Sequence, residues 1–195
     1  MTDEVLMLAV RDGDLTQLGP LFERHHVALF DFLSRMTGDR AAAEDLVQDV
    51  FLRVLKYRST YRDGGCFETW LFRIARNLRA DYFRRRPAAA ALPDDVLDRP
   101  DGFAGPAHQL ELARNHARLR KALALLRDDQ RELIVLARFR TMKHEQIAEI
   151  LGVDVGVVRV RLHRAIRELR DVFVRLPDER SLWNVQKSTS GLPTT

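Results

Sequence analysis

The sequence predicts an all-α protein with two small helical domains, joined by a linker rich in proline, alanine and aspartate. Apolar residues recur at the 3.6-residue period of an amphipathic helix over residues 1–87 and again over residues 109–176. Between them, residues 88–108 break every periodic pattern, as a linker does. The second domain ends in a helix-turn-helix pattern, and a polar tail of residues 177–195 follows it.

Composition limits the classes of function that this chain can have. The 195 residues carry a formal net charge of +4 and a sequence pI of about 9.6, which suits a polyanionic partner without proving one. A single cysteine, Cys66, excludes an internal disulfide framework and a cysteine-rich zinc site. The acidic amino terminus lacks the layout of a signal peptide, and no apolar run is long enough to span a bilayer. We therefore expect a cytoplasmic protein without membrane insertion.

The first two helices are predicted from capping residues and glycine stops. Thr2 or Asp3 caps a short helix that Gly13 ends. Asp14 then caps a longer helix, which Gly38 ends.

Two adjacent histidines, His25 and His26, interrupt the apolar face of the second helix. Adjacent histidines invite interpretation as a metal site, but neither a cysteine cluster nor a histidine one turn away supports it. We expect a histidine in or beside the core, no metal and no other cofactor.

The third helix, residues 41–57 after an Asp39 cap, turns an acidic ridge outward. The ridge consists of Glu44, Asp45, Gln48 and Asp49. Acidic residues near the amino end of a helix favour its dipole, which accounts for Glu44 and Asp45, but Asp49 lies too far along. The ridge suits docking of a basic partner equally well, and physical chemistry alone leaves both interpretations open.

The stretch CFETWLFRIARNLRADYFRRR, residues 66–86, predicts the helix around which the first domain is organised. Its apolar face is expected in the core and consists of Phe67, Trp70, Leu71, Ile74, Ala75, Leu78 and Tyr82. The opposite face carries Phe72, Arg76, Arg79 and Phe83, flanked by Arg73, Asn77 and Arg84. Cations beside flat apolar rings suit a phosphate backbone and unstacked bases. The alternative is a basic helix whose Phe72 and Phe83 pack under a neighbouring segment.

The preceding loop, residues 58–65, adds a ring and cations to the same neighbourhood. Arg58, Tyr61 and Arg62 lie in it, and two glycines give it mobility. Because the loop leads directly into the arginine-rich helix, any ligand of that helix is expected to meet the loop. Tyr61 is the best candidate for contact with an unstacked base.

The second domain is predicted to be helical throughout, with helices over about residues 110–126, 129–139, 144–151 and 155–173. The last two form the helix-turn-helix, with Gly152 where the turn requires a positive φ and Asp154 as the next cap. Outward positions of the last helix are expected to face base edges in a major groove, and they are Arg159, Val160, His163, Arg164 and Arg167. An ordinary amphipathic helix with surface arginines is the alternative.

Three segments, in order, resemble the extracytoplasmic-function sigma factors of bacterial RNA polymerase. They are GDRAAAEDLVQDVFLRV, FETWLFRIARNLRADYFRRR and EQIAEILGVDVGVVRVRLHRAIREL. The resemblance covers roughly residues 5–175 and extends to the proline-rich linker and the total length. It implies a promoter-specificity subunit that has no catalytic chemistry of its own. Its partners would be core RNA polymerase, promoter DNA and an anti-sigma factor.

The resemblance also implies roles for individual residues. Docking on the clamp helices of the β′ subunit would fall to Asp45, Leu46, Gln48 and Asp49. The −10 element would be bound and opened by Arg58, Tyr61, Phe72, Arg73, Arg76, Asn77, Arg79, Phe83 and Arg84. The −35 element would be read by Arg159, Val160, His163, Arg164 and Arg167, and the second domain would also touch the β flap.

The recognition helix departs from the family pattern, which usually has threonine and serine where this chain has Val157 and Val160. Valine offers no hydroxyl to a phosphate or a base edge, although Val160 can contact a thymine methyl group.

Two other classes of function are weighed against this one. A stand-alone helix-turn-helix regulator would add a helical sensor domain, but a sensor has no reason to display Arg76 and Arg79 beside outward rings. An enzyme would need a nucleophile–base pair, a phosphate-binding loop or metal-ligand spacing, and the sequence contains none of these patterns.

Overall fold

The computed structural model describes residues 1–85 and 106–177, and helices make up all the regular structure within these two ranges. The all-α prediction is therefore confirmed. The predicted linker and the polar tail with Trp183 lie outside the described residues, except at their edges. The linker was predicted to extend to residue 108, but the first helix of the second domain begins earlier, at Pro106. Proline is favoured in the first turn of a helix, where its missing N–H leaves no bond unmade.

Four helices build the first domain, and they are α1 (Asp3–Arg11), α2 (Leu18–Thr37), α3 (Arg40–Tyr57) and α4 (Phe67–Arg85). Short 3₁₀ turns, Leu15–Gln17 and Arg58–Thr60, precede α2 and follow α3. The Asp39 carboxylate accepts a hydrogen bond from the backbone N–H of Ala42 at 3.0 Å and caps α3 as predicted. Gly38 ends α2 with a φ of 71°, a left-handed conformation that glycine adopts without strain.

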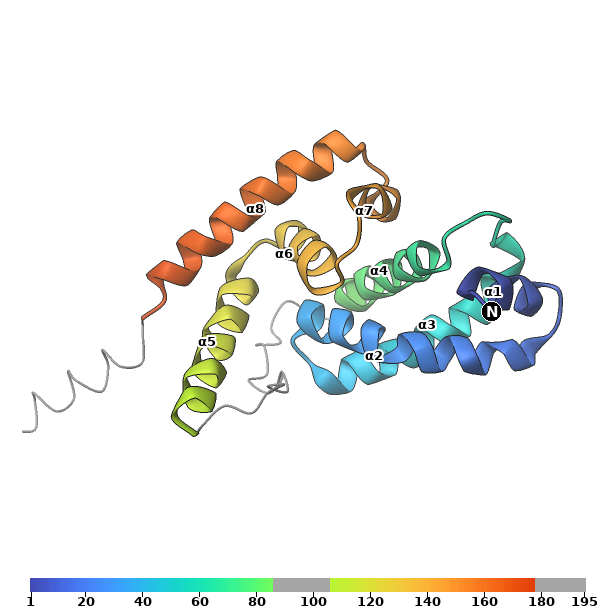
Figure 1. Cartoon of the computed structure of the whole chain (residues 1–195), viewed down its shortest axis with the longest axis horizontal. Helices are drawn as coiled ribbons and strands as arrows, with labels where there is room; N and C mark the ends of the chain where they lie inside the picture. Colours follow the sequence, from blue (N-terminus) through green and yellow to red (C-terminus); the bar gives the residue numbers. More distant parts are fainter. Residues whose placement is uncertain (86–105, 178–195) are drawn as a thin grey trace, which may run out of the picture.

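The apolar face of α4 forms the centre of the first domain. Phe67, Trp70, Leu71, Ala75 and Leu78 are buried, as the helical period predicts. Figure 1 shows α4 lying across α2 and α3, with α1 near its amino-terminal end.

The second domain contains α5 (Pro106–Leu125), α6 (Asp128–Ile134), α7 (His144–Leu151) and α8 (Val155–Arg175). A π-helical turn, Val135–Phe139, continues α6. Gly152 ends α7 with a φ of 67° and donates its backbone N–H to the carbonyl of Ala148, which makes the predicted turn between α7 and α8.

The two domains pack against each other along α4. Figure 1 shows α6 and α7 on the side of α4 that faces away from α3. Arg131 of α6 joins the domains, because its guanidinium donates to the carbonyls of Leu123, Ala124 and Leu126 at the end of α5 and to Met36 of α2. Burial lowers the pKa of this guanidinium from its ordinary value. One buried apolar cluster consequently continues from the first domain into the second.

Candidate nucleic-acid interface

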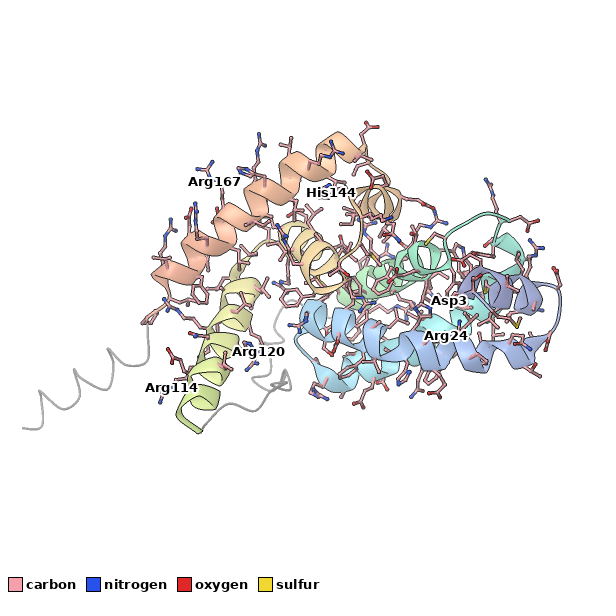
Figure 2. All side chains as sticks on the ribbon, viewed as in Figure 1. Asp3, Arg24, Arg114, Arg120, His144 and Arg167 are labelled. Carbon is pink, nitrogen blue, oxygen red and sulfur yellow. The ribbon has the colours of Figure 1, made fainter. Side chains whose placement is uncertain are left out.

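The outward face of α8 carries the residues expected to read bases. Val158, Leu162 and Ala165 are buried and hold the helix against the rest of the domain. The opposite positions are all exposed, and they are Arg159, Val160, His163, Arg164 and Arg167. Figure 2 shows Arg167 pointing away from the body of the molecule. The predicted outward placement of this set is confirmed, and contact with bases stays a prediction.

The prediction that Phe72 points outward from α4 is wrong. The ring is fully buried, and it meets Phe32 edge to face with 5.3 Å between the ring centroids. The guanidinium of Arg140, from the second domain, lies 5.3 Å from the ring centroid of Phe72 on the π-bearing face. The alternative interpretation, in which this ring packs under a neighbouring segment, therefore holds for Phe72.

Tyr61 is not offered to a base in this structure either. The side chain is only 3% exposed, and its hydroxyl donates to the carbonyl oxygen of Gly65 at 2.5 Å. Its ring packs edge to face against Trp70, with 5.4 Å between centroids. Burial raises the pKa of the Tyr61 phenol to about 12, to which the charge of Glu4 adds. Tyr61 thus fastens the loop to the core, so the expectation of a mobile ring is wrong, and its contact with an unstacked base stays a prediction.

The two central arginines of α4 are paired with carboxylates of α6. Arg79 binds both oxygens of Asp128, at 3.0 and 2.5 Å, and is only 5% exposed. The Nε atom of Arg76 lies 3.2 Å from each carboxylate oxygen of the buried Glu132. The two central arginines of the expected phosphate-binding face are therefore engaged by carboxylates of the second domain.

The remaining members of the α4 set differ in their surroundings. Arg73, Asn77, Phe83 and Arg84 are exposed, as predicted. Arg84 pairs with Asp81, which also accepts a hydrogen bond from Arg53. These hydrogen bonds lower the pKa of the Asp81 carboxyl. Arg58, in the turn before the loop, is half-buried and donates to the carbonyl of Leu55 at 2.7 Å.

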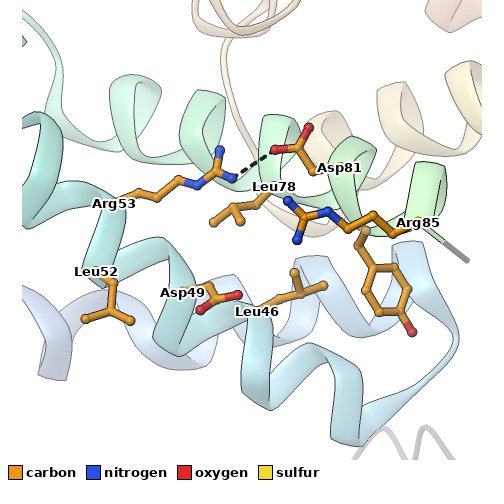
Figure 3. A pocket seen from close by; sticks show the side chains of 8 residues that line it. Leu46, Asp49, Leu52, Arg53, Leu78, Asp81 and Arg85 are labelled. Atoms are coloured by element: carbon orange, nitrogen blue, oxygen red, sulfur yellow. Dashed lines mark hydrogen bonds and ion pairs between the residues drawn. The ribbon is translucent and has the colours of Figure 1, made fainter.

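The predicted docking ridge borders a groove between α3 and α4. Asp45, Gln48 and Asp49 are exposed, whereas Leu46 is buried at the groove. The groove has a volume of about 410 Å³ and is lined by Leu46, Asp49, Leu52, Arg53, Leu78, Asp81, Tyr82 and Arg85. Figure 3 shows Asp49 and Leu52 on one wall and the Arg53–Asp81 ion pair across it.

Sequence reasoning missed Leu52 as part of this surface. Its side chain is 62% exposed on the outward side of α3. The sequence pattern could have identified Leu52, because a large apolar residue at an outward helical position beside an acidic ridge is typical of a binding surface.

His25 lies in the core region, as expected. It is buried, and its Nε2 atom is 2.6 Å from a carboxylate oxygen of Asp3. Figure 2 shows Arg24 close to the same aspartate, and the two form an ion pair at 2.7 Å. Within residues 1–85 and 106–177, no three His, Cys, Asp or Glu side chains gather closely enough to hold a metal ion. None of the helices described there is both long and apolar enough to cross a bilayer.

Comparison with known protein families gives two matches. One family is described as Sigma-70 region 2 and matches residues 21–88. The other is described as Sigma-70, region 4 and matches residues 116–169. The first match contains α3 and α4, and the second contains the helix-turn-helix.

Curated relatives match over most of the chain. The RNA polymerase sigma factor CarQ of Myxococcus xanthus is 34% identical, over 85% of this chain and 94% of CarQ. The ECF RNA polymerase sigma factor ShbA of Streptomyces griseus is 40% identical, over 71% of this chain and 75% of ShbA. The ECF RNA polymerase sigma factor SigE of Mycolicibacterium smegmatis is 35% identical, over 82% of this chain and 62% of SigE.

Two solved structures resemble this fold. CnrH, in complex with the cytosolic domain of CnrY, has a TM-score of 0.67 and 28% identity, covering 87% of this chain and 96% of CnrH. The sigma factor RpoE of Bartonella quintana, in complex with the anti-sigma factor NepR, has a TM-score of 0.67 over 82% of this chain and 98% of RpoE. The identity of the second is 23%, so that likeness concerns the fold.

Proposed function

The chain belongs to the extracytoplasmic-function (ECF) sigma factors of bacterial RNA polymerase, and on that premise we propose which of its helices binds each partner. As a sigma factor it directs transcription initiation with core polymerase at promoter DNA. We assign the −35 element to α8, the −10 element to α4 and core polymerase to the ridge on α3. All three roles are binding roles without catalysis. We place them in the cytoplasm, where bacterial RNA polymerase acts.

The observation that best supports these assignments is the outward face of α8. Arg159 and Arg164 are exposed near the amino-terminal half of a helix that follows a glycine turn, which is the arrangement of a recognition helix. Val160 is exposed between them and is suited to a thymine methyl group. The regulator with a sensor domain is not favoured, because the segment that would be the sensor matches Sigma-70 region 2.

The groove between α3 and α4 supports the assignment to polymerase. Asp49 offers a negative charge at its edge, and Leu52 offers an exposed apolar contact. An interface that combines a charged rim with an apolar centre is typical of protein–protein docking. We also infer that an anti-sigma factor binds this chain, because the family resemblance implies such a partner and because CnrH, which shares this fold, is solved with a partner protein, the cytosolic domain of CnrY.

The first test uses transcription. Core polymerase free of sigma is combined with the full chain and with genomic promoter fragments, and the initiating sequences are recovered. Arg159→Ala and Arg164→Ala are each compared with Arg170→Ala, which removes an exposed arginine from the far half of α8. Loss of a base-reading arginine is expected to weaken promoter binding by about 1–3 kcal/mol and to relax preference at one upstream position.

Loss of a phosphate contact would instead weaken binding to all promoters alike. If neither substitution changes affinity or preference beyond the Arg170→Ala control, α8 does not read the upstream element.

A further inference from the structure

We propose that Arg11 is a positioning residue for promoter opening, because it holds the loop of residues 58–65 in the shape that offers Arg62 to the −10 strand. The inference rests on the proposed function, which assigns the −10 element to α4, and the loop leads directly into that helix. Arg11 itself is the last residue of α1, outside the elements assigned to DNA.

The loop ends in a tight turn whose tip is exposed. The backbone N–H of Gly65 donates to the carbonyl of Arg62 at 3.1 Å, and Gly64 between them has a φ of 74°. A Cβ at Gly65 would lie 3.1 Å from that same carbonyl oxygen, closer than side chains normally approach. Arg62 and Asp63 are exposed at the tip. An arginine placed there, just before α4, can meet a phosphate of a strand bound along that helix.

Arg11 reaches this turn from α1. Its Nη1 atom donates to the Asp63 carboxylate at 2.5 Å and to the carbonyl oxygen of Tyr61 at 3.4 Å. Its Nε atom donates to the neighbouring Asp12 at 2.9 Å. A single guanidinium therefore ties both the side chain at the tip and the backbone at the base of the turn to the end of α1.

The helix that carries Arg11 is itself firmly anchored. Its buried side chains are Leu6, Met7 and Val10. In its first turn, Asp3 pairs with Arg24 of α2 at 2.7 Å and lies 2.6 Å from the Nε2 atom of His25. Figure 1 shows α1 beside the segment that connects α3 and α4. Because α1 is held at its start and along its length, Arg11 gives the loop a fixed point of attachment.

The ion pair also governs the charge that the loop presents to DNA. Asp63 adjoins Arg62, and an unpaired carboxylate at the tip would repel a phosphate and attract the neighbouring guanidinium. Pairing with Arg11 offsets that negative charge. In the parts of the chain that the structure describes, no carboxylate pairs with the Arg62 side chain. Arg62 is therefore the cation that the turn offers to a phosphate.

The contact orders the loop and contributes little to the stability of the fold. The Asp63 side chain is 77% exposed, and an exposed ion pair adds little to the free energy of unfolding. Such a pair still decides which conformation a surface loop adopts, because the alternatives differ little in free energy. The apparent affinity of the loop for DNA then falls with the fraction of chains in which the loop is ordered.

The experiment compares two aspartates that share Arg11. Asp63→Asn removes the partner in the loop, whereas Asp12→Asn removes the partner at the end of α1. Both side chains are exposed and both substitutions remove one negative charge, so Asp12→Asn is a matched control. Arg11→Ala, Arg62→Ala and the double variant Arg11→Ala, Asp63→Asn complete the set. All variants are full chains.

The first readout is hydrogen exchange at the backbone amides of Tyr61 and Gly65, which donate to the carbonyls of Arg58 and Arg62. Exchange is expected to be roughly fivefold faster in Arg11→Ala and about two- to threefold faster in Asp63→Asn, the scale of an exposed ion pair. Asp12→Asn is expected to exchange as the wild type does. Urea denaturation midpoints are expected to stay unchanged in all of them, which separates positioning from unfolding.

The second readout is the affinity of the holoenzyme for a promoter fragment recovered by transcription, with its −10 region mismatched so that it stays single-stranded. Arg11→Ala and Asp63→Asn are expected to weaken binding in about the same ratios as they speed exchange. Arg62→Ala is expected to weaken it at least as much as Arg11→Ala. Electrostatics alone predicts that loss of an acid strengthens DNA binding, so weakening by Asp63→Asn identifies positioning. Binding to a duplex that ends upstream of the −10 region is expected to stay unchanged.

Exchange at Tyr61 and Gly65 equal to that of Asp12→Asn overturns the inference and leaves the proposed function intact. Unchanged or tighter promoter binding by Asp63→Asn also overturns it. Additive losses in the double variant do so too, because a shared contact predicts that this variant binds no more weakly than Arg11→Ala.

The same assay separates this inference from the assignment of α4. If Arg62→Ala binds the mismatched promoter as the wild type does, the loop makes no such contact and the inference is overturned. Asn77→Ala, at an exposed position of α4, is then measured on the same fragment. If Asn77→Ala also binds as the wild type does, the assignment of the −10 element to α4 fails too.

Discussion

Tyr61 has two effects at the scale of a single residue. Its hydroxyl fastens the loop before α4 to the carbonyl of Gly65, and its ring completes an aromatic cluster with Phe67 and Trp70. Since burial favours the neutral phenol, the pKa of Tyr61 rises from 10.0 to about 12 in the folded chain. A group whose folded pKa is raised stabilises the fold fully below its unfolded pKa, and this stabilisation is lost as pH rises through the folded pKa.

The Tyr61→Phe substitution separates the hydrogen bond of the phenol from the packing of its ring. At neutral pH the variant loses one hydrogen bond, so the free energy of unfolding is expected to fall by about 1 kcal/mol. Between pH 10 and 12 the wild type is expected to lose stability relative to the variant. The reason is that the Tyr61 phenol ionises at lower pH in the unfolded chain than in the folded chain, and the variant lacks this group. Urea denaturation across this range measures the difference. Tyr57→Phe, at a tyrosine that is 40% exposed, should not reproduce it.

The position of Phe72 shows where local periodicity stops being informative. The helical period places this residue opposite the apolar face of α4, and that geometry is correct. Its neighbours, however, are Phe32 of α2 and Arg140 of the second domain, which lie far from it in the sequence. Local patterns identify the face that a helix buries within its own domain, but they do not reveal a second surface that covers the opposite face.

At the scale of an element, the ends of helices were the most predictable features. Asp39 and Gly38 act at the ends expected for them, because a cap uses only backbone groups within a few residues. Asp128 is the exception. The helix predicted over residues 129–139 begins one residue earlier, at Asp128, and the Asp128 carboxylate binds Arg79. A distant charge therefore replaces the local cap.

Two glycines of the helix-turn-helix provide a matched test at this scale. Apart from the adjacent residues and the backbone of the helix itself, neither has an atom within 4 Å of where a Cβ would lie, so the backbone conformation decides the effect. Gly152 has a positive φ, and Gly152→Ala is expected to lower the free energy of unfolding by about 1 kcal/mol. Gly156 lies inside α8, and Gly156→Ala is expected to raise it by about 0.5–1 kcal/mol.

Urea denaturation of both variants measures these changes. Because the substitution is the same and the sites are close in sequence, a shift of both variants in the same direction would contradict the assignment of the turn at Gly152.

At the scale of the whole molecule, the sequence indicated both domains but not their contact. Composition marks residues 88–108 as a break, and each side of it has its own helical pattern. The contact between the domains depends on side chains whose partners are 49 and 56 residues away, such as Arg79 with Asp128 and Arg76 with Glu132. Charges at such separations show no periodicity, so only the three-dimensional arrangement reveals which acid meets which base.

Arg140 tests whether this contact couples the stability of the two domains. Its guanidinium joins Glu68 and the ring of Phe72, both on α4, to the end of the π-helical turn in the second domain. Arg140→Ala is expected to weaken docking by about 1–2 kcal/mol, the size of a partly desolvated cation–π contact with an added ion pair. Thermal unfolding followed by circular dichroism should then separate into two transitions, with the wild type unfolding in one. Arg138→Ala removes an exposed arginine from the same turn and is expected to leave the single transition intact. Two transitions in the wild type, or one in Arg140→Ala, would show that the domains unfold without energetic coupling through this residue.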